Sequence, residues 1–209
     1  MRQPLKTGLV VIVAYLLWTT WMSRSAAVAL EPSGYTLTYT MTWGWGMDEK
    51  ISLSRFGGWW SRHSSEWFSV WDKPYNSGAS VYRSADGGSY FFAVGYKLWK
   101  FELSSGALTS YCDSKTLPYT SLGTQIATAT SYRTVAAIDP GAQSREEYVE
   151  PAQQSGPVPA SPPDSKYYAN LKYLGRFGLV RSGGRGNEVR FVPANHAPEP
   201  RLGLFANCG

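Results

Sequence analysis

Alternation of apolar and polar side chains marks the clearest strand of this chain. Over residues 35–43, threonines alternate with large apolar side chains, namely Tyr35, Leu37, Tyr39, Met41 and Trp43. A period of two built from β-branched and aromatic residues is typical of a strand with one buried face. Ile51 and Leu53 continue the alternation in a shorter strand, and residues 66–71 are a third candidate with an ambiguous facing pattern.

Two turn sequences predict hairpins farther along the chain. Asp86, Gly87 and Gly88 separate a strand that begins at Val81 from one over residues 89–94, as expected of a tight hairpin. A Ser-Ser-Gly turn at 104–106 separates strands over 96–103 and 107–112. Similar patterns predict further strands at 125–130, 132–138, 171–180, 188–192 and 201–205.

Residues 139–165 differ in composition, because six prolines accompany Gln, Ser and Gly there. The segment has too few apolar side chains to offset the entropy of ordering it, so we expect a flexible loop. The strands after this loop are too short to build a core of their own. We therefore expect them to complete the sheet begun before it, within a single domain over residues 30–209.

The predicted fold class is all-β and mostly antiparallel, either a sandwich or a partly open barrel of roughly 9–11 short strands. Composition agrees with this class. Aromatic residues reach 15% and charged residues only 17%, and the chain has 21 glycines. Strands and turns favour such residues.

The first 29 residues have the layout of a secretory signal. Arg2 and Lys6 precede an apolar run over residues 8–22, and residues 27–29 form an Ala-Val-Ala site that suits a signal peptidase. We expect export and cleavage after Ala29, which places a bacterial-type protein in the periplasm or outside the cell. The competing interpretation is an uncleaved signal anchor in the inner membrane. As a helix the run is ~22 Å long, shorter than the ~30 Å hydrocarbon core of a bilayer.

The net charge of +5 is concentrated in this leader. Without Arg2, Lys6 and Arg24, 17 basic residues face 15 acidic ones, which leaves a net charge of +2. Such a mildly basic domain gives little reason to expect nucleic acid as a partner. Contact with a membrane is expected only if the N-terminal segment remains uncleaved.

Two cysteines, Cys112 and Cys208, are the whole cysteine content. An even number in an exported chain predicts one disulfide, here between the middle of the domain and its end. Two unpaired thiols are the alternative. Neither a metal site nor a cofactor is predicted, because His63 and His196 lack ligand spacing with the cysteines and no phosphate loop or dinucleotide motif is present.

Two groups of residues are candidates for binding. Six tryptophans cluster within residues 43–71, and Trp45, Trp59 and Trp60 stand next to or close to glycines, where we expect partial exposure. Exposed indoles stack on sugar rings and also anchor protein partners; the alternative is that these rings fill the core. Arg176, Arg181, Arg185 and Arg190 form a basic run across a Gly-rich turn at residues 182–187. Arg181 and Arg185 would present guanidinium groups there to phosphate or carboxylate; the alternative is a solvated turn.

For catalysis the sequence offers only His63 and Glu66, which stand among serines without a nucleophile-elbow motif. An enzyme is therefore not the preferred hypothesis. The preferred function is a binding or structural protein of the cell envelope whose aromatic surface contacts a glycan or an envelope protein. The alternatives are a hydrolase of an envelope polymer and a single-pass anchored subunit of a membrane assembly.

Overall fold

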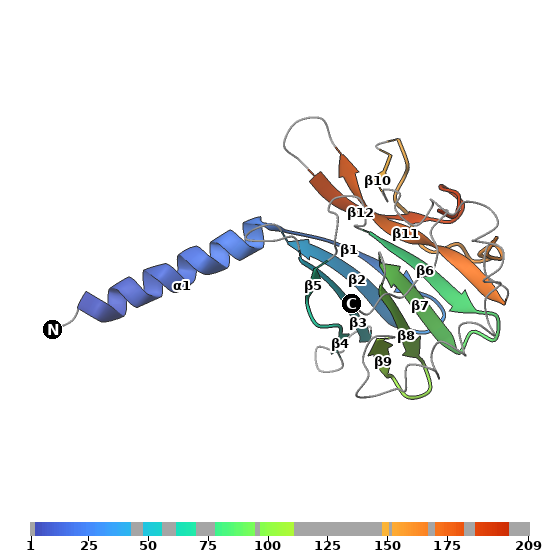
Figure 1. The fold of residues 1–209 in the computed structure, drawn as a ribbon, viewed down its shortest axis with the longest axis horizontal. Coiled ribbons are helices and arrows are strands. Elements are labelled where there is room, and N and C mark those ends of the chain that lie inside the picture. Colours follow the sequence, from blue (N-terminus) through green and yellow to red (C-terminus); the bar gives the residue numbers. More distant parts are fainter. Residues whose placement is uncertain are drawn as a thin grey trace.

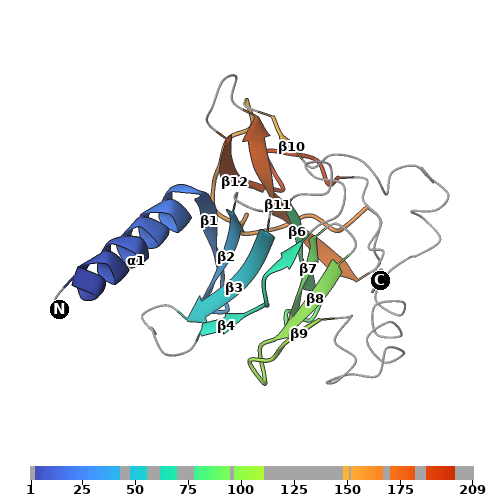
Figure 2. The same ribbon diagram turned by 60° about the vertical axis from the view of Figure 1, so that its left-hand side comes forward.

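A computed structural model describes residues 3–42, 48–55, 62–69, 78–94, 97–110, 148–150, 152–166, 170–181 and 187–200. Within these ranges the chain forms one helix, α1 (Gln3–Trp21), and twelve strands. The strands build two sheets, as Figures 1 and 2 show. All pairs of strands are antiparallel except one short parallel pair, which confirms the mostly antiparallel β class.

The first sheet contains β1 (Ser23–Leu30), β2 (Tyr35–Thr42), β3 (Asp48–Arg55), β4 (Arg62–Ser64) and β5 (Phe68–Ser69). Its order is β1-β2-β3-β4, and β5 pairs with β3 beside β4. The strand predicted from the threonine alternation is β2, and the one predicted through Ile51 and Leu53 is β3. The sequence patterns did not predict β1 or β4.

The second sheet contains β6 (Ala79–Ser84), β7 (Ser89–Val94), β8 (Lys97–Glu102), β9 (Leu108–Ser110), β10 (Tyr148–Val149), β11 (Leu171–Arg181) and β12 (Asn187–Pro193). Its order is β10-β11-β6-β7-β8-β9, with β12 on β11. Because β11 pairs with β6, the prediction that the late strands complete the earlier sheet is confirmed. The strands predicted at 125–130, 132–138 and 201–205 lie outside the described residues.

One hydrophobic core lies between the two sheets. The first sheet contributes the inward positions of the predicted alternation, and the second contributes aromatic side chains, so that the largest fully buried residues include Tyr39, Tyr90, Phe92, Phe101 and Phe177. The ring of Tyr39 stacks on that of Phe177 with 5.5 Å between the centroids. Along one side of the core, β1 of the first sheet contacts β12 of the second.

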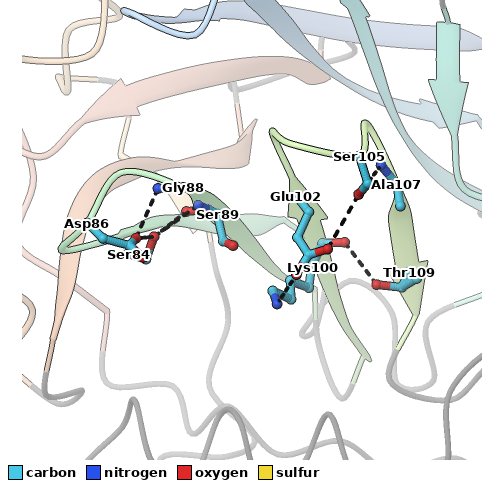
Figure 3. A network of polar contacts seen from close by, with 9 residues as sticks. All are labelled: Ser84, Asp86, Gly88, Ser89, Lys100, Glu102, Ser105, Ala107 and Thr109. Carbon is cyan, nitrogen blue, oxygen red and sulfur yellow. Dashed lines mark hydrogen bonds and ion pairs between the residues drawn. The ribbon is translucent and has the colours of Figure 1, made fainter.

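Both predicted hairpins are confirmed, and Figure 3 shows the polar contacts that close them. In the turn between β6 and β7, Asp86 accepts a hydrogen bond from the amide of Gly88 at 2.9 Å, and Gly87 has a φ of +74°. A hydrogen bond from the hydroxyl of Ser84 is the main reason that the pKa of Asp86 is lowered. These side chains replace backbone partners in a tight turn.

In the neighbouring hairpin, Lys100 and Glu102 form an ion pair of 2.6 Å on the outward side of β8. The hydrogen bond from Lys100 is the main reason that the pKa of Glu102 is lowered. The hydroxyl of Ser105 donates to the same carboxylate and accepts from the amide of Ala107 at 3.3 Å. This network holds the Ser-Ser-Gly turn together.

The second half of the Pro-rich segment covers the outer face of the second sheet. Val149 in β10 lies in parallel beside Val180, and these two side chains form a small second cluster with Val192 and Ala197. Gln153 binds the sheet through Arg176 and Arg190, at 3.3 Å and 3.4 Å. The composition of residues 139–165 predicts a flexible loop. Residues 139–147 lie outside the described part of the chain, and residues 152–166 have defined contacts.

Candidate functional site

Helix α1 projects away from the sheets (Figures 1 and 2), and none of its described side chains belongs to the hydrophobic core. Its large apolar residues are exposed on every side: Leu9, Val10, Val11, Ile12, Val13, Tyr15, Leu16, Leu17, Trp18 and Trp21. A helix that is apolar all round is normally enclosed by protein or lipid. Among the described residues, no helix combines the length and the apolar character needed to cross a bilayer.

The junction between α1 and β1 is a single residue, Met22. The guanidinium of Arg24 donates to the carbonyl oxygens of Trp21 and Ser23, at 2.7 Å and 2.9 Å. A cation at the last carbonyls of a helix is favourable because those groups carry partial negative charge. The helix therefore leads into the first strand without a linker, and Arg24 stabilises the turn between them.

Strand β1 pairs with β2 over its full length of eight residues, from Ser23 opposite Thr42 to Leu30 opposite Tyr35. Its inward side chains reach the core, where Val28 is 5% exposed and Leu30 is 0% exposed. Ala27 and Ala29 face outward and are exposed. The Ala-Val-Ala sequence predicted as a cleavage site is thus placed inside a strand of the first sheet.

The outer face of the first sheet carries an exposed tryptophan. Because Glu49 pairs with Phe68 and Asp48 pairs with Ser69, Trp67 stands beside Lys50 on the outer face. The ammonium of Lys50 lies 5.4 Å from the centroid of the indole. Trp67 is 49% exposed and is the one exposed large apolar side chain in the described part of the β domain.

Hydroxyl groups extend the same row across the sheet. Lys50 pairs with Thr40 on β2, and Thr40 pairs with Ser25 on β1. Asp48 on β3 and Thr42 on β2 form the pair two residues along from Lys50 and Thr40, toward the end of the sheet where α1 enters. We call the group Trp67, Lys50, Thr40, Asp48 and Ser25 the Trp67 platform; its members from β1, β2 and β3 are half-buried or exposed.

The inner face behind the platform is closed. Phe68 packs on Trp99 of the second sheet, with 4.6 Å between the ring centroids. Glu49 is 0% exposed on this inner face, opposite Met41 and Phe68. Its neighbour Asp48 faces outward, so these two acids point to opposite sides of β3.

His63 and Glu66, the candidate catalytic residues, are in different surroundings. His63 lies on β4, half-buried, with its ring 5.9 Å from Phe101 and 6.5 Å from Tyr35. Glu66 follows the end of β4 and is exposed. The structure therefore places His63 against aromatic rings, and its catalytic role stays a prediction.

The predicted binding and disulfide residues Trp45, Trp59, Trp60, Arg185, Cys112 and Cys208 lie outside the described residues, and their roles stay predictions. Arg181 ends β11, and its side chain is also outside the described part. Of the same basic run, Arg176 and Arg190 bind Gln153 of the Pro-rich segment. Their part in the described structure is to hold that segment on the sheet.

A second polar cluster lies beneath the Pro-rich segment. Glu199 is 6% exposed and accepts hydrogen bonds from the hydroxyl of Ser165 and the amide of Lys166, both at 2.6 Å. The phenol of Tyr82 is a further partner. Desolvation outweighs these donors, so the pKa of Glu199 is raised. The contact with Tyr82 of β6 fastens the segment around Glu199 to the second sheet.

The sequence places Trp67 in the tryptophan cluster of residues 43–71 but does not predict its exposure, and it does not predict the burial of Glu199. The alternation of side chains along β3 places Lys50 on the face opposite Ile51. The pattern of residues 66–71 does not predict which face of the sheet Trp67 lies on. Only the pairing of β5 with β3 settles it. In the described ranges no cluster of His, Cys, Asp and Glu is arranged to hold a metal ion.

No family model, curated protein or solved structure matches this chain in the three comparisons.

Proposed function

We propose that this chain is a cell-envelope protein that keeps its N-terminal helix as a lipid-embedded tether. Its sandwich-like β domain lies outside the cytoplasm and acts as a binding or structural module. The observation that carries the proposal is the place of β1 in the first sheet. Cleavage after Ala29 would remove seven of the eight residues of this strand, including Val28 in the core.

Loss of β1 would cost a large part of the stability of the domain. Full burial of a Val or Leu side chain contributes ~1.5–3 kcal/mol, and Val28 and Leu30 both depend on this strand. Removing it also leaves β2 as an unpaired edge. Globular proteins are stable by only ~5–15 kcal/mol. Residues 23–30 therefore belong to the folded domain, and α1 precedes them by one residue.

Lipid is the environment that suits α1. Apolar side chains cover all its sides, Lys6 stands near its start, and the chain has no acidic residue before Glu31. Cations before an apolar segment favour a cytoplasmic N-terminus, which directs the β domain outward. The stretch from Leu9 to Trp21 is ~20 Å long, shorter than a bilayer core of ~30 Å, so its insertion requires local thinning of the bilayer.

The test is the state of the full chain after expression in a bacterial host. Membranes are washed at high pH and the protein is identified by intact mass. The expected result is a chain with residues 1–29 present, resistant to the wash and accessible to protease from the periplasmic side. Recovery of a soluble chain that begins at Leu30 would refute both the tether and the role of β1. A soluble chain that begins near Ser23 would refute the tether and leave β1 in place.

A further inference from the structure

The exposed indole of Trp67 is available to contact a binding partner. A large aromatic ring that is half exposed on a sheet forgoes much of the stabilisation that its burial would give. Every other large apolar side chain exposed in the described residues belongs to α1. Its neighbour Phe68 is buried against Trp99, and the ammonium of Lys50 lies 5.4 Å from the centroid of the indole.

The polar groups around the indole are arranged on a grid. Neighbouring strands are ~4.8 Å apart, and alternate residues on one face of a strand are ~7 Å apart. Lys50, Thr40 and Ser25 therefore follow one another at the strand spacing, and Asp48 lies one step along β3. The platform supplies donors from Lys50 and the hydroxyls, and acceptors from Asp48 and the hydroxyls.

This combination fits a carbohydrate. One face of a sugar ring is made of C–H groups that stack on an aromatic ring, and its edge carries hydroxyls that both donate and accept hydrogen bonds. The outer face of β1, β2 and β3 gives a chain of linked sugars room to lie across the strands. The platform and a sugar are therefore complementary, because the indole matches the C–H face of the sugar and the polar side chains match its hydroxyls.

Two other classes of partner fit less well. Anionic lipid headgroups attract clusters of Lys and Arg, whereas the Trp67 platform contains one cation, Lys50, and one acid, Asp48. The centres of protein interfaces are rich in several aromatic and apolar side chains. The Trp67 platform instead has one indole at the end of a row of polar side chains.

We propose that the Trp67 platform is a glycan-binding site, with Trp67 as the stacking ring and Lys50, Asp48 and Thr40 as hydrogen-bonding partners of the sugar hydroxyls. The inference names a ligand class for the binding module proposed above and rests on that proposal for the exposure of the domain to the envelope. Binding to the purified protein is measured separately from tethering, so failure of one is distinguishable from failure of the other.

The test is an NMR titration of the full chain in a detergent without a sugar headgroup. The probes are a chito-oligosaccharide, a cello-oligosaccharide and soluble peptidoglycan fragments. The chain has nine tryptophans. The indole N–H resonance of Trp67 is assigned by its loss in Trp67→Phe, so it reports on stacking at this ring separately from the others. The expected result is a saturable shift of this resonance and of the backbone amide of Thr40 with at least one probe.

Matched variants locate the site. Trp67→Ala weakens binding roughly tenfold, as expected from loss of an aromatic contact, while Trp18→Ala leaves it unchanged because this similarly exposed indole lies on α1. Thr40→Val weakens binding and Thr36→Val does not, since Thr36 faces the same way on β2 but lies ~13 Å from Thr40.

Three results overturn the inference. One is the absence of any shift with all three probes. Another is a set of shifts that leaves the Trp67 indole unmoved or persists in Trp67→Ala. The third is a response of the Trp67 indole to anionic phospholipid added to the detergent micelles but not to the sugars, which would assign the platform to the membrane surface. Folding of each variant is checked by its amide spectrum without ligand.

Discussion

Substitution of Val28 by aspartate separates a retained β1 from a cleaved leader. Val28 is the middle residue of the Ala-Val-Ala site, and signal peptidases require small residues on either side of that position rather than at it. In the folded domain the same side chain is 5% exposed in the core. The two interpretations therefore expect opposite consequences for the mature protein.

The magnitude follows from burial. Val28→Ala removes two methyl groups from the core and costs about 2 kcal/mol, which corresponds to a loss of ~4–8 °C in Tm for a domain of this size. Val28→Asp leaves an unpaired carboxylate at the same place and costs ~3–5 kcal/mol. The assay is thermal unfolding of the purified chain, followed by circular dichroism, together with its intact mass.

Ala27→Asp is the matched control, because Ala27 is the adjacent residue but faces outward. If β1 is retained, Ala27→Asp stays within about 1 kcal/mol of the wild-type stability and has the same N-terminus. If the leader is cleaved, Ala27→Asp blocks processing, and Val28→Asp yields the wild-type mature chain with an unchanged Tm. That last outcome would refute the reasoning from β1.

Two further predictions concern the second sheet. The raised pKa of Glu199 means that the native state binds its proton more tightly than the unfolded state; the contribution of this group to stability is therefore greatest below pH ~4.5 and declines as the pH rises through the native pKa. Urea midpoints measured against pH are expected to show this decline, with a smaller slope in Glu199→Gln; equal slopes would contradict the assignment. Gly175→Ala is expected to cost about 3 kcal/mol, because the new methyl would meet the carbonyl oxygen of Val192 at a φ of +143°. Gly34→Ala, at a φ of +71° in open space, is the control and costs ~1 kcal/mol; equal losses in the two variants would show that packing at Gly175 is looser than described.

Gly175 illustrates why the pairing of β11 was beyond sequence analysis. The pattern of residues 171–180 indicates a strand, but not that this strand pairs with β6 along its first half and with β12 along its second. The register shifts between Tyr173 and Gly175, where a close approach of backbones requires glycine. The backbone that approaches Gly175 is that of Val192, a residue distant in sequence, so a local pattern does not predict the contact.

The candidate site divides in the same way. The parity of β3 fixes Lys50 on the face opposite Ile51 and Leu53, which the sequence alone indicates. The facing of Trp67 depends on two residues of β5 pairing with β3, and a strand that short has no periodicity of its own. The buried state of Glu199 depends likewise on Ser165 and Tyr82, which reach it from separate elements.

By itself the sequence determined the β class, the threonine-faced strand, both hairpins and the apolar character of the N-terminal segment. These features are local, since period-two patterns and turn residues act over a few neighbours. Only the tertiary structure decided that residues 23–30 form a strand. Their small side chains resemble a cleavage site, and their role appears only when β2 supplies the hydrogen-bonding partner and the core encloses Val28 and Leu30.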